Sequence, residues 1–177
     1  MFRYQLDPDT YLKLIDTRDS YDHFHLIDKN RKHLRDWFAW VDDVISPETY
    51  ESYMKYSLNE FVEKRMLPVG IWYKGQLAGF CSLADIHPVN RSANFAYYLG
   101  EEFQGHGLVT KTVSALMSYA FTGLGLRRIE IRCGTQNAKS RAIPERLGFQ
   151  QEGTIRQCEW LYDHFIDNAV YGMLASD

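Results

Sequence analysis

The spacing of apolar residues along the chain predicts which segments are helices and which are strands. Over residues 50–62 apolar side chains return every three or four positions, the period of one helical face, and Ser46-Pro47 just before them is typical of a helix N-terminus. Residues 69–73, 77–86 and 93–99 are apolar runs bounded by turn residues, which predicts strands. Connections this short join antiparallel neighbours, so the middle of the chain predicts an antiparallel sheet.

The remaining segments likewise divide into those with the helical spacing of apolar residues and those with apolar runs typical of strands. The pattern predicts a first strand over residues 10–15 and mostly helix over residues 18–38. Two later helices are expected over residues 108–122 and 137–147, and the other strands over residues 126–133, 149–156 and 167–174. Because there is no linker, repeat or low-complexity tract, residues 1–177 are expected to form one α/β domain, with a mixed and mostly antiparallel central sheet flanked by helices.

Two glycines, Gly105 and Gly107, flank His106 where a strand gives way to a helix. A helix N-terminus carries backbone N–H groups without an intrahelical partner, and glycines beside it let an anion such as phosphate approach without meeting a Cβ. A turn that needs glycine only for its own geometry explains the pair equally well. Two nucleotide-binding schemes fit poorly: Leu108-Val109 stands where a P-loop has Lys-Ser/Thr, and Thr110 replaces the third glycine of a dinucleotide-binding loop.

Composition and charge narrow the range of partners. The chain has 177 residues, 45% of them hydrophobic, and a net charge of −3, which argues against a nucleic-acid-binding protein because such proteins are usually basic. No apolar run approaches the ~20 residues that span a bilayer, and the N-terminus lacks the apolar core of a signal peptide, so we expect a cytoplasmic protein that does not bind membranes. Cys81, Cys133 and Cys158 match neither a disulfide framework nor a metal motif, which predicts free thiols and no metal.

Two motifs resemble the signatures of the GNAT acetyltransferases. Gln104-Gly105-His106-Gly107-Leu108-Val109 is similar to the Q/R-x-x-G-x-G/A loop with which that family grips the pyrophosphate of acetyl-coenzyme A (acetyl-CoA). Asn137-x-x-Ser140, followed by Glu145-Arg146-x-Gly148-Phe149, resembles the second signature, which lines the pantetheine arm. Residues 34–41 and 152–174 are similar to segments of the ribosomal-protein N-terminal acetyltransferase branch. The resemblance therefore covers the whole chain and implies a GNAT fold.

The resemblance implies acetyl-CoA as co-substrate and a set of binding residues around the glycine loop, the first of which acts through its backbone. The set comprises Leu99, Gln104, Gly105, His106, Gly107, Leu108, Val109, Asn137 and Ser140. Two of these positions depart from the family pattern. Val109 replaces a small residue, which is tolerable if its Cβ faces the core, as the helical stripe indicates. His106 replaces a more usual Lys or Arg and so removes a positive charge.

For the chemistry, the resemblance implies Glu159 as the base that accepts a proton from the incoming ammonium group. Its neighbours Trp160 and Leu161 are expected to shield it in part from water. Ser140 is either the acid that protonates the leaving thiolate or only a cofactor contact. The reserve acid–base groups are His87, Asp85 and Tyr162.

The acceptor that the branch implies is the N-terminal α-amine of a ribosomal protein. The alternatives are a small amine, such as a polyamine or an aminoglycoside, and a non-catalytic acetyl-CoA-binding module; a homodimer is compatible with the sequence. An open cleft would suit a protein N-terminus, whereas a closed, acidic pocket would suit a small amine. Trp37, Phe38 and Trp40 either shape this cleft or belong to the core.

Overall fold

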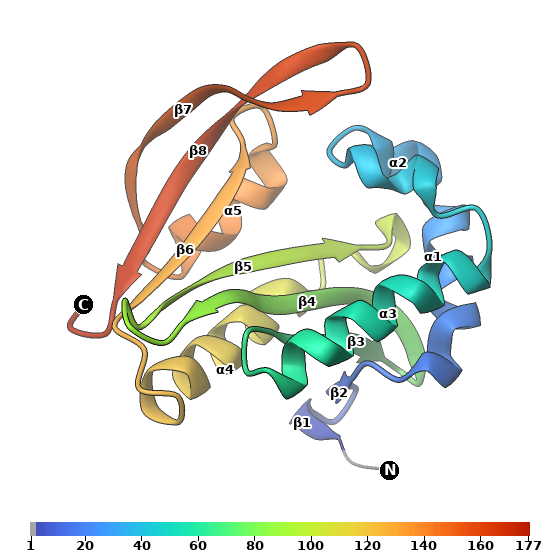
Figure 1. Cartoon of the computed structure of the whole chain (residues 1–177), viewed down its shortest axis with the longest axis horizontal. Coiled ribbons are helices and arrows are strands. Elements are labelled where there is room, and N and C mark those ends of the chain that lie inside the picture. Colours follow the sequence, from blue (N-terminus) through green and yellow to red (C-terminus); the bar gives the residue numbers. More distant parts are fainter. Residues whose placement is uncertain (1–2) are drawn as a thin grey trace.

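Eight strands form one sheet in the computed structural model, which describes residues 3–177 (Figure 1). Along the sheet they follow the order β1-β2-β3-β4-β5-β6-β8-β7. The strands are β1 (Tyr4–Asp7), β2 (Thr10–Leu14), β3 (Leu67–Tyr73), β4 (Gln76–His87), β5 (Ser92–Leu99), β6 (Arg128–Gly134), β7 (Gln150–Leu161) and β8 (His164–Leu174). All neighbours are antiparallel except β5 and β6, so the predicted mixed, mostly antiparallel sheet is confirmed.

Helices cover both faces of the sheet, and each layer encloses its own apolar core (Figure 1). The helices are α1 (Ser20–Lys29), α2 (Arg31–Arg35), α3 (Pro47–Val62), α4 (Leu108–Thr122) and α5 (Ala138–Arg146), with 3₁₀ turns η1 (Thr17–Asp19), η2 (Ala39–Asp43) and η3 (Glu101–Phe103). In the layer of α1–α3, Tyr50 and Met54 pack with Tyr98 of β5. On the opposite face, Val113 of α4 packs with Ile131 of β6. Within residues 3–177, none of the helices combines the length and apolarity needed to cross a bilayer.

The start of α3 confirms a local prediction. Ser46 is the N-cap and Pro47 the first helical residue. Ser46 Oγ accepts a hydrogen bond from the N–H of Thr49 (3.3 Å), and Thr49 Oγ1 accepts one from the N–H of Ser46 (3.0 Å). This reciprocal capping box satisfies N–H groups for which the helix itself offers no acceptor.

The helix predicted over residues 18–38 is broken, so that prediction is wrong in part. The chain passes from α1 to α2 at Asn30, and α2 ends at Arg35. The side chain of Asn30 explains the break. Its Nδ2 donates to the carbonyl of Leu26 (3.0 Å), and its Oδ1 accepts from the N–H of Glu101 (2.8 Å), in the turn that leads toward α4. A side chain that bonds to backbone groups in this way competes with a continuous helix.

Two features at the sheet edges lie outside the predicted pattern. β1 is too short for its period to be readable. β7 and β8 extend beyond the predicted strands 149–156 and 167–174, and they form a long hairpin that reaches past the sheet toward α2 (Figure 1). β7 is the last strand of the sheet, and residues 150–158 are all exposed. Because this stretch buries no face, its side chains do not alternate between apolar and polar, and the sequence pattern does not show where the strand ends.

The parallel pair β5 and β6 stays together for only part of its length. The pairing runs from Ser92 opposite Arg128 to Phe95 opposite Ile131 and ends there. β5 continues to Leu99 while paired with β4, and β6 continues to Gly134 while paired with β8. The sheet therefore splits at the carboxyl ends of these two strands, which is where open α/β sheets commonly bind ligands.

Candidate active site at the split in the sheet

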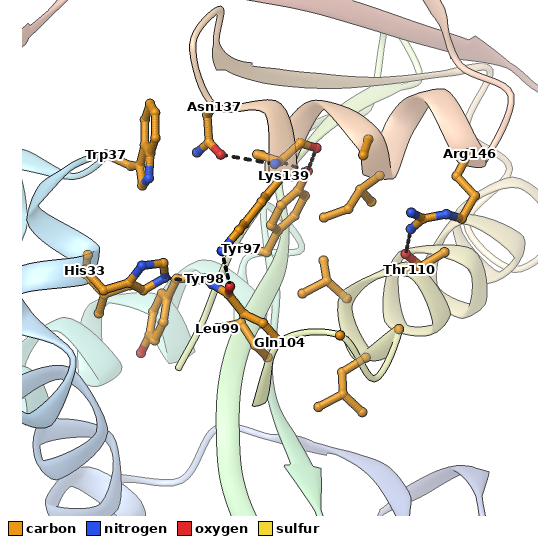
Figure 2. A pocket seen from close by; sticks show the side chains of 18 of the residues that line it. His33, Trp37, Tyr97, Tyr98, Leu99, Gln104, Thr110, Asn137, Lys139 and Arg146 are labelled. Atoms are coloured by element: carbon orange, nitrogen blue, oxygen red, sulfur yellow. Dashed lines mark hydrogen bonds between the residues drawn. The ribbon is translucent and has the colours of Figure 1, made fainter. Parts of the chain in front are cut away.

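A cavity of about 920 Å³ lies beside the end of β5, where β6 has diverged from it (Figure 2). Its wall is made by α2 and the segment after it, β5, the loop before α4, the start of α4, and α5. The wall contains all the residues that the resemblance implies for acetyl-CoA except His106: Leu99, Gln104, Gly105, Gly107, Leu108, Val109, Asn137 and Ser140. The two motifs, which are well separated in the chain, thus meet at one cavity.

The glycine loop has a backbone geometry that favours glycine. Gly105 has a φ of +81° and Gly107 a φ of +68°, both in the left-handed region. A Cβ placed on either residue would find no atom within 4 Å, so both face open space. α4 begins at Leu108 without a side-chain cap, which leaves N–H groups of its first turn free for a ligand. The two glycines therefore serve the turn geometry and also keep a helix N-terminus open to an anion.

The two departures from the family pattern occupy different surroundings. Val109 is 7% exposed and packs in the core under α4, so the expectation that its Cβ faces the core is confirmed. His106 is exposed and lies outside the cavity wall, with its ring stacked on Tyr73 of β3 at a centroid separation of 5.1 Å. Three cationic side chains lie elsewhere in the wall, and one of them, Lys111, is paired with Asp7 (2.7 Å). Within the described chain, the ionic side chains of the wall are all basic: Lys111, Lys139 and Arg146.

Tyr97 and Ser140 form a pair of hydroxyl groups in the cavity. Asn137 caps α5 by accepting a hydrogen bond from the N–H of Ser140 (3.1 Å), which fixes the first turn of that helix. The Oγ of Ser140 then lies 3.3 Å from the phenolic oxygen of Tyr97. Burial raises the pKa of Tyr97 well above its usual range, so the phenol stays protonated. The pattern predicted a strand at Tyr97 but gave no reason to select it from its tyrosine neighbour.

Gln104 joins three parts of the wall through its side chain (Figure 2). Lys139 Nζ of α5 donates to Gln104 Oε1 (2.7 Å), and Gln104 Nε2 lies 2.9 Å from Nε2 of His33 on α2. Because the amide nitrogen can only donate, this nitrogen of His33 is the acceptor. Arg146 of α5 likewise reaches Thr110 of α4 (3.0 Å). His33 and Lys139 carry no motif, so the sequence offered no signal for either residue.

Part of the cavity wall belongs to the opposite face of the sheet. Trp37 and Phe38 line it there, together with Tyr98. Trp40 is outside the wall and packs on Phe38 and Tyr98, at centroid separations of 5.4 and 5.5 Å. Of the three aromatic residues, Trp37 and Phe38 therefore shape the cleft, whereas Trp40 packs behind them in the core. Tyr98 is itself held by Tyr50, whose phenolic oxygen lies 2.9 Å away.

Glu159 lies on β7, outside the wall of the cavity. Its carboxylate is half-buried, and Oε2 accepts a hydrogen bond from Nδ2 of Asn168 on β8 (3.0 Å). Leu161 is buried, but Trp160 is 51% exposed and packs edge-on against Phe165. The expected shielding by Trp160 is therefore wrong. Adjacent residues of a strand point to opposite faces, which places the indole on the other side from the carboxylate.

The three reserve acid–base groups lie at different distances from the cavity. His87 pairs with Ser92 at the start of β5, whereas the cavity lies at the end of that strand. Asp85, near it on β4, accepts a hydrogen bond from Asn94. Tyr162, at the tip of the β7–β8 hairpin, donates to the carbonyl of Phe38 (2.7 Å) and so ties the hairpin to the cavity wall. Only Tyr162 of the three is close to the site.

Comparisons with known proteins agree with this arrangement. A family model described as acetyltransferase (GNAT) domain matches residues 11–150. A putative ribosomal N-acetyltransferase (YdaF) of Bacillus subtilis is 31% identical over 98% of this chain and 96% of its own length. The spermidine N(1)-acetyltransferase of Escherichia coli is 29% identical over 85% of this chain and 75% of its own. A solved ribosomal L7/L12 α-N-protein acetyltransferase in complex with coenzyme A has a TM-score of 0.95 at 25% identity, covering 99% of this chain and 100% of that one.

The chain therefore belongs to the GNAT acetyltransferases. The split sheet, the glycine loop at an open helix N-terminus and the matching relatives define an N-acetyltransferase with the fold that the two motifs implied.

Proposed function

We propose that the chain transfers the acetyl group of acetyl-CoA to the N-terminal α-amine of a protein, and that the acceptor is a ribosomal protein. The charge of the cavity wall supports the donor part of this proposal. Within the described chain its ionic side chains are Lys111, Lys139 and Arg146, all basic, and Lys111 is paired with Asp7. Such a wall attracts the phosphates of the donor. Similarity to ribosomal acetyltransferases along nearly the whole chain carries the acceptor part.

The residues of the cavity fit acetyl-CoA. The open backbone at Gly105 and Gly107 and the uncapped start of α4 suit the diphosphate, and Lys139 and Arg146 lie nearby as cations. The part of β5 beyond Phe95, which no longer pairs with β6, offers backbone groups to the pantetheine arm. When bound, acetyl-CoA supplies the thioester to be transferred. We assign its contacts to the residues of the wall and leave His106 outside them.

Acetyl transfer to an ammonium group forms a C–N bond and breaks the C–S bond of the thioester; the nitrogen loses two protons and the departing sulfur gains one. Glu159 is the proposed base: an N–H bond breaks, an O–H bond forms on its carboxylate, and the nitrogen lone pair becomes free to attack. Ser140 Oγ is the proposed acid for the sulfur. Tyr97, held protonated and 3.3 Å from Ser140 Oγ, orients that hydroxyl. The second proton from the nitrogen returns to Ser140 Oγ through water, and Glu159 releases its proton to solvent, which restores both side chains.

Ser140→Ala should raise the Kd for acetyl-CoA by about 3- to 10-fold, because one hydrogen bond is lost, and should lower kcat by at least about 100-fold, because the proton donor is lost. Titration calorimetry and steady-state kinetics measure the two effects separately. Ser114→Ala, on the exposed side of α4, is the matched control and should change neither. A raised Kd with an unchanged kcat would make Ser140 a cofactor contact only.

A panel of acceptors tests the proposed substrate class. The purified protein with acetyl-CoA should acetylate N-terminal peptides of ribosomal proteins with a kcat/KM at least about 100-fold above that for spermidine or an aminoglycoside. Thiol release and mass spectrometry of the products are the readouts. A preference for spermidine, the substrate named for one relative, would overturn the acceptor and leave the family intact. Binding of acetyl-CoA without turnover on any amine would indicate a non-catalytic module.

A further inference from the structure

Asn168 is a buried amide with one half of its hydrogen-bonding capacity unused. The residue is 9% exposed, and its Nδ2 donates to Oε2 of Glu159 at 3.0 Å. Its Oδ1 has no hydrogen-bond partner among residues 3–177. Rotating the amide by half a turn would place that oxygen against the carboxylate, so the contact with Glu159 fixes the observed orientation. A buried acceptor held without a partner is unfavourable and therefore calls for an explanation.

The strand register places this pair on the acceptor side of the sheet. Asn168 is opposite Gly134 of β6, and Glu159 is opposite Ile166 of β8. Cross-strand partners share a face of the sheet. A Cβ added to Gly134 would lie 3.5 Å from the ring of Trp37 and 3.6 Å from Ile166, so all of these residues gather on one face. Since Trp37 lines the cavity, the pair lies next to the wall where the acceptor must arrive.

A bulge in β7 produces the contact between the two side chains. Ile155 pairs with Asn168 and Glu159 with Ile166, so β7 uses more residues than β8 over the same distance. Gln157 in the bulge has a φ of +47°, and its N–H donates to Asp167 Oδ1 (2.8 Å). A regular ladder would place Glu159 opposite His164 instead, beyond the reach of Asn168. Bulges commonly redirect a side chain in this way beside active sites.

The charged groups on the surrounding elements have other partners. Arg132 of β6 pairs with Glu130, Arg35 of α2 pairs with Asp42, His164 pairs with Asp163, and Asp167 accepts from the backbone of the bulge. Among the hydrogen bonds of residues 3–177, Asn168 supplies the one that reaches the carboxylate of Glu159. The amide is therefore the neighbour through which the structure acts on this carboxylate.

We propose that Asn168 is a positioning residue for acetyl transfer, which rests on the proposed role of Glu159 as base. Its Nδ2–H group holds and orients the Glu159 carboxylate. An N–H of the acceptor ammonium donates to Oε1 of Glu159. The proton then moves from nitrogen to that oxygen, while the amide keeps its own protons and holds the carboxylate in place.

Asn168→Ala should lower kcat/KM for the acceptor by about 10- to 100-fold, with a raised acceptor KM, and leave the Kd for acetyl-CoA within about twofold. Asn94→Ala is the matched control. Asn94 also donates to a carboxylate at 3.0 Å, that of Asp85, but lies away from the cavity, so its removal should change neither kcat/KM nor the acceptor KM.

Asn168→Asp keeps the size of the side chain and tests the same inference if the alanine variant does not fold. Aspartate lacks the N–H group that orients Glu159 and its charge repels that carboxylate, so kcat/KM for the acceptor should fall at least as far as in Asn168→Ala. A kcat/KM and an acceptor KM that stay at the wild-type values in a folded variant would overturn the inference. Full activity of Glu159→Gln at neutral pH would instead overturn the base assignment, so the two failures are distinguishable.

Discussion

Glu159→Gln should lower kcat for acetyl transfer by about two to four orders of magnitude at neutral pH, while the Kd for acetyl-CoA stays within about twofold. Glutamine has nearly the size and shape of glutamate and still offers an oxygen to Asn168, but it cannot take a proton from the ammonium. The cavity wall does not contain Glu159, so the donor should bind as before. Single-turnover kinetics and calorimetric titration measure the two quantities.

The remaining activity of this variant should depend on pH in a characteristic way. It should rise through the range in which a free α-amine loses its proton, about pH 7.7–8.0, because an amine that is already neutral needs no base. Glu152→Gln is the matched control, since Glu152 lies on the same strand and is paired with Arg128 away from the cavity. If Glu159→Gln kept the wild-type kcat at neutral pH, Glu159 would not be the base, and a chain of water molecules would have to accept the proton.

Gly105→Ala should weaken acetyl-CoA binding by about 10- to 100-fold, which corresponds to the loss of one or two hydrogen bonds to a charged phosphate. Gly105 lines the cavity with a left-handed backbone, so an added methyl group both strains the loop and intrudes where the diphosphate would lie. Gly75 is the matched control. Its φ of +79° almost equals the +81° of Gly105, and a Cβ at either residue meets no atom within 4 Å.

The comparison with Gly75→Ala separates strain from binding. Both substitutions should reduce the free energy of unfolding by about 1–2 kcal/mol, since alanine disfavours the left-handed region. Only the one in the cavity should change the Kd for acetyl-CoA, because Gly75 lies in the turn between β3 and β4. Denaturant unfolding and calorimetric titration of the two variants decide the matter. If both variants bound acetyl-CoA with the wild-type Kd, the glycine loop would not be part of the binding site.

Local spacing in the sequence was sufficient to predict α4 and the loop before it. The apolar stripe of the helix and the two glycines are adjacent in the chain, so each can be read without knowing what packs on them. The break at Asn30 was not predictable, because its cause is a hydrogen bond to the backbone of Glu101, far along the chain. The full extent of β7 was hidden because an exposed edge strand needs no alternating pattern.

The candidate site was predictable to the degree that its residues occur in motifs. Gln104 and Ser140 were identified through the resemblance of their motifs to the GNAT signatures, and both line the cavity. His33 enters only because α2 folds beside the glycine loop, where it meets Gln104. The partner of Glu159 depends on a bulge that shifts the register of β7 against β8. Such contacts arise from tertiary packing, so they leave no periodic trace in the sequence.

Tyr97 and Tyr98 are neighbours in the chain, yet they serve opposite sides of the split. The first contacts Ser140 on the α5 side, and the second packs with Tyr50 and Trp40 on the side of α1–α3. Under the proposed function, strand alternation divides the two substrates between two layers of the protein. We therefore expect substitutions on the Tyr98 side to change which amine is accepted while the Tyr97 side keeps acetyl-CoA. Relatives named for ribosomal proteins and for spermidine fit such a division.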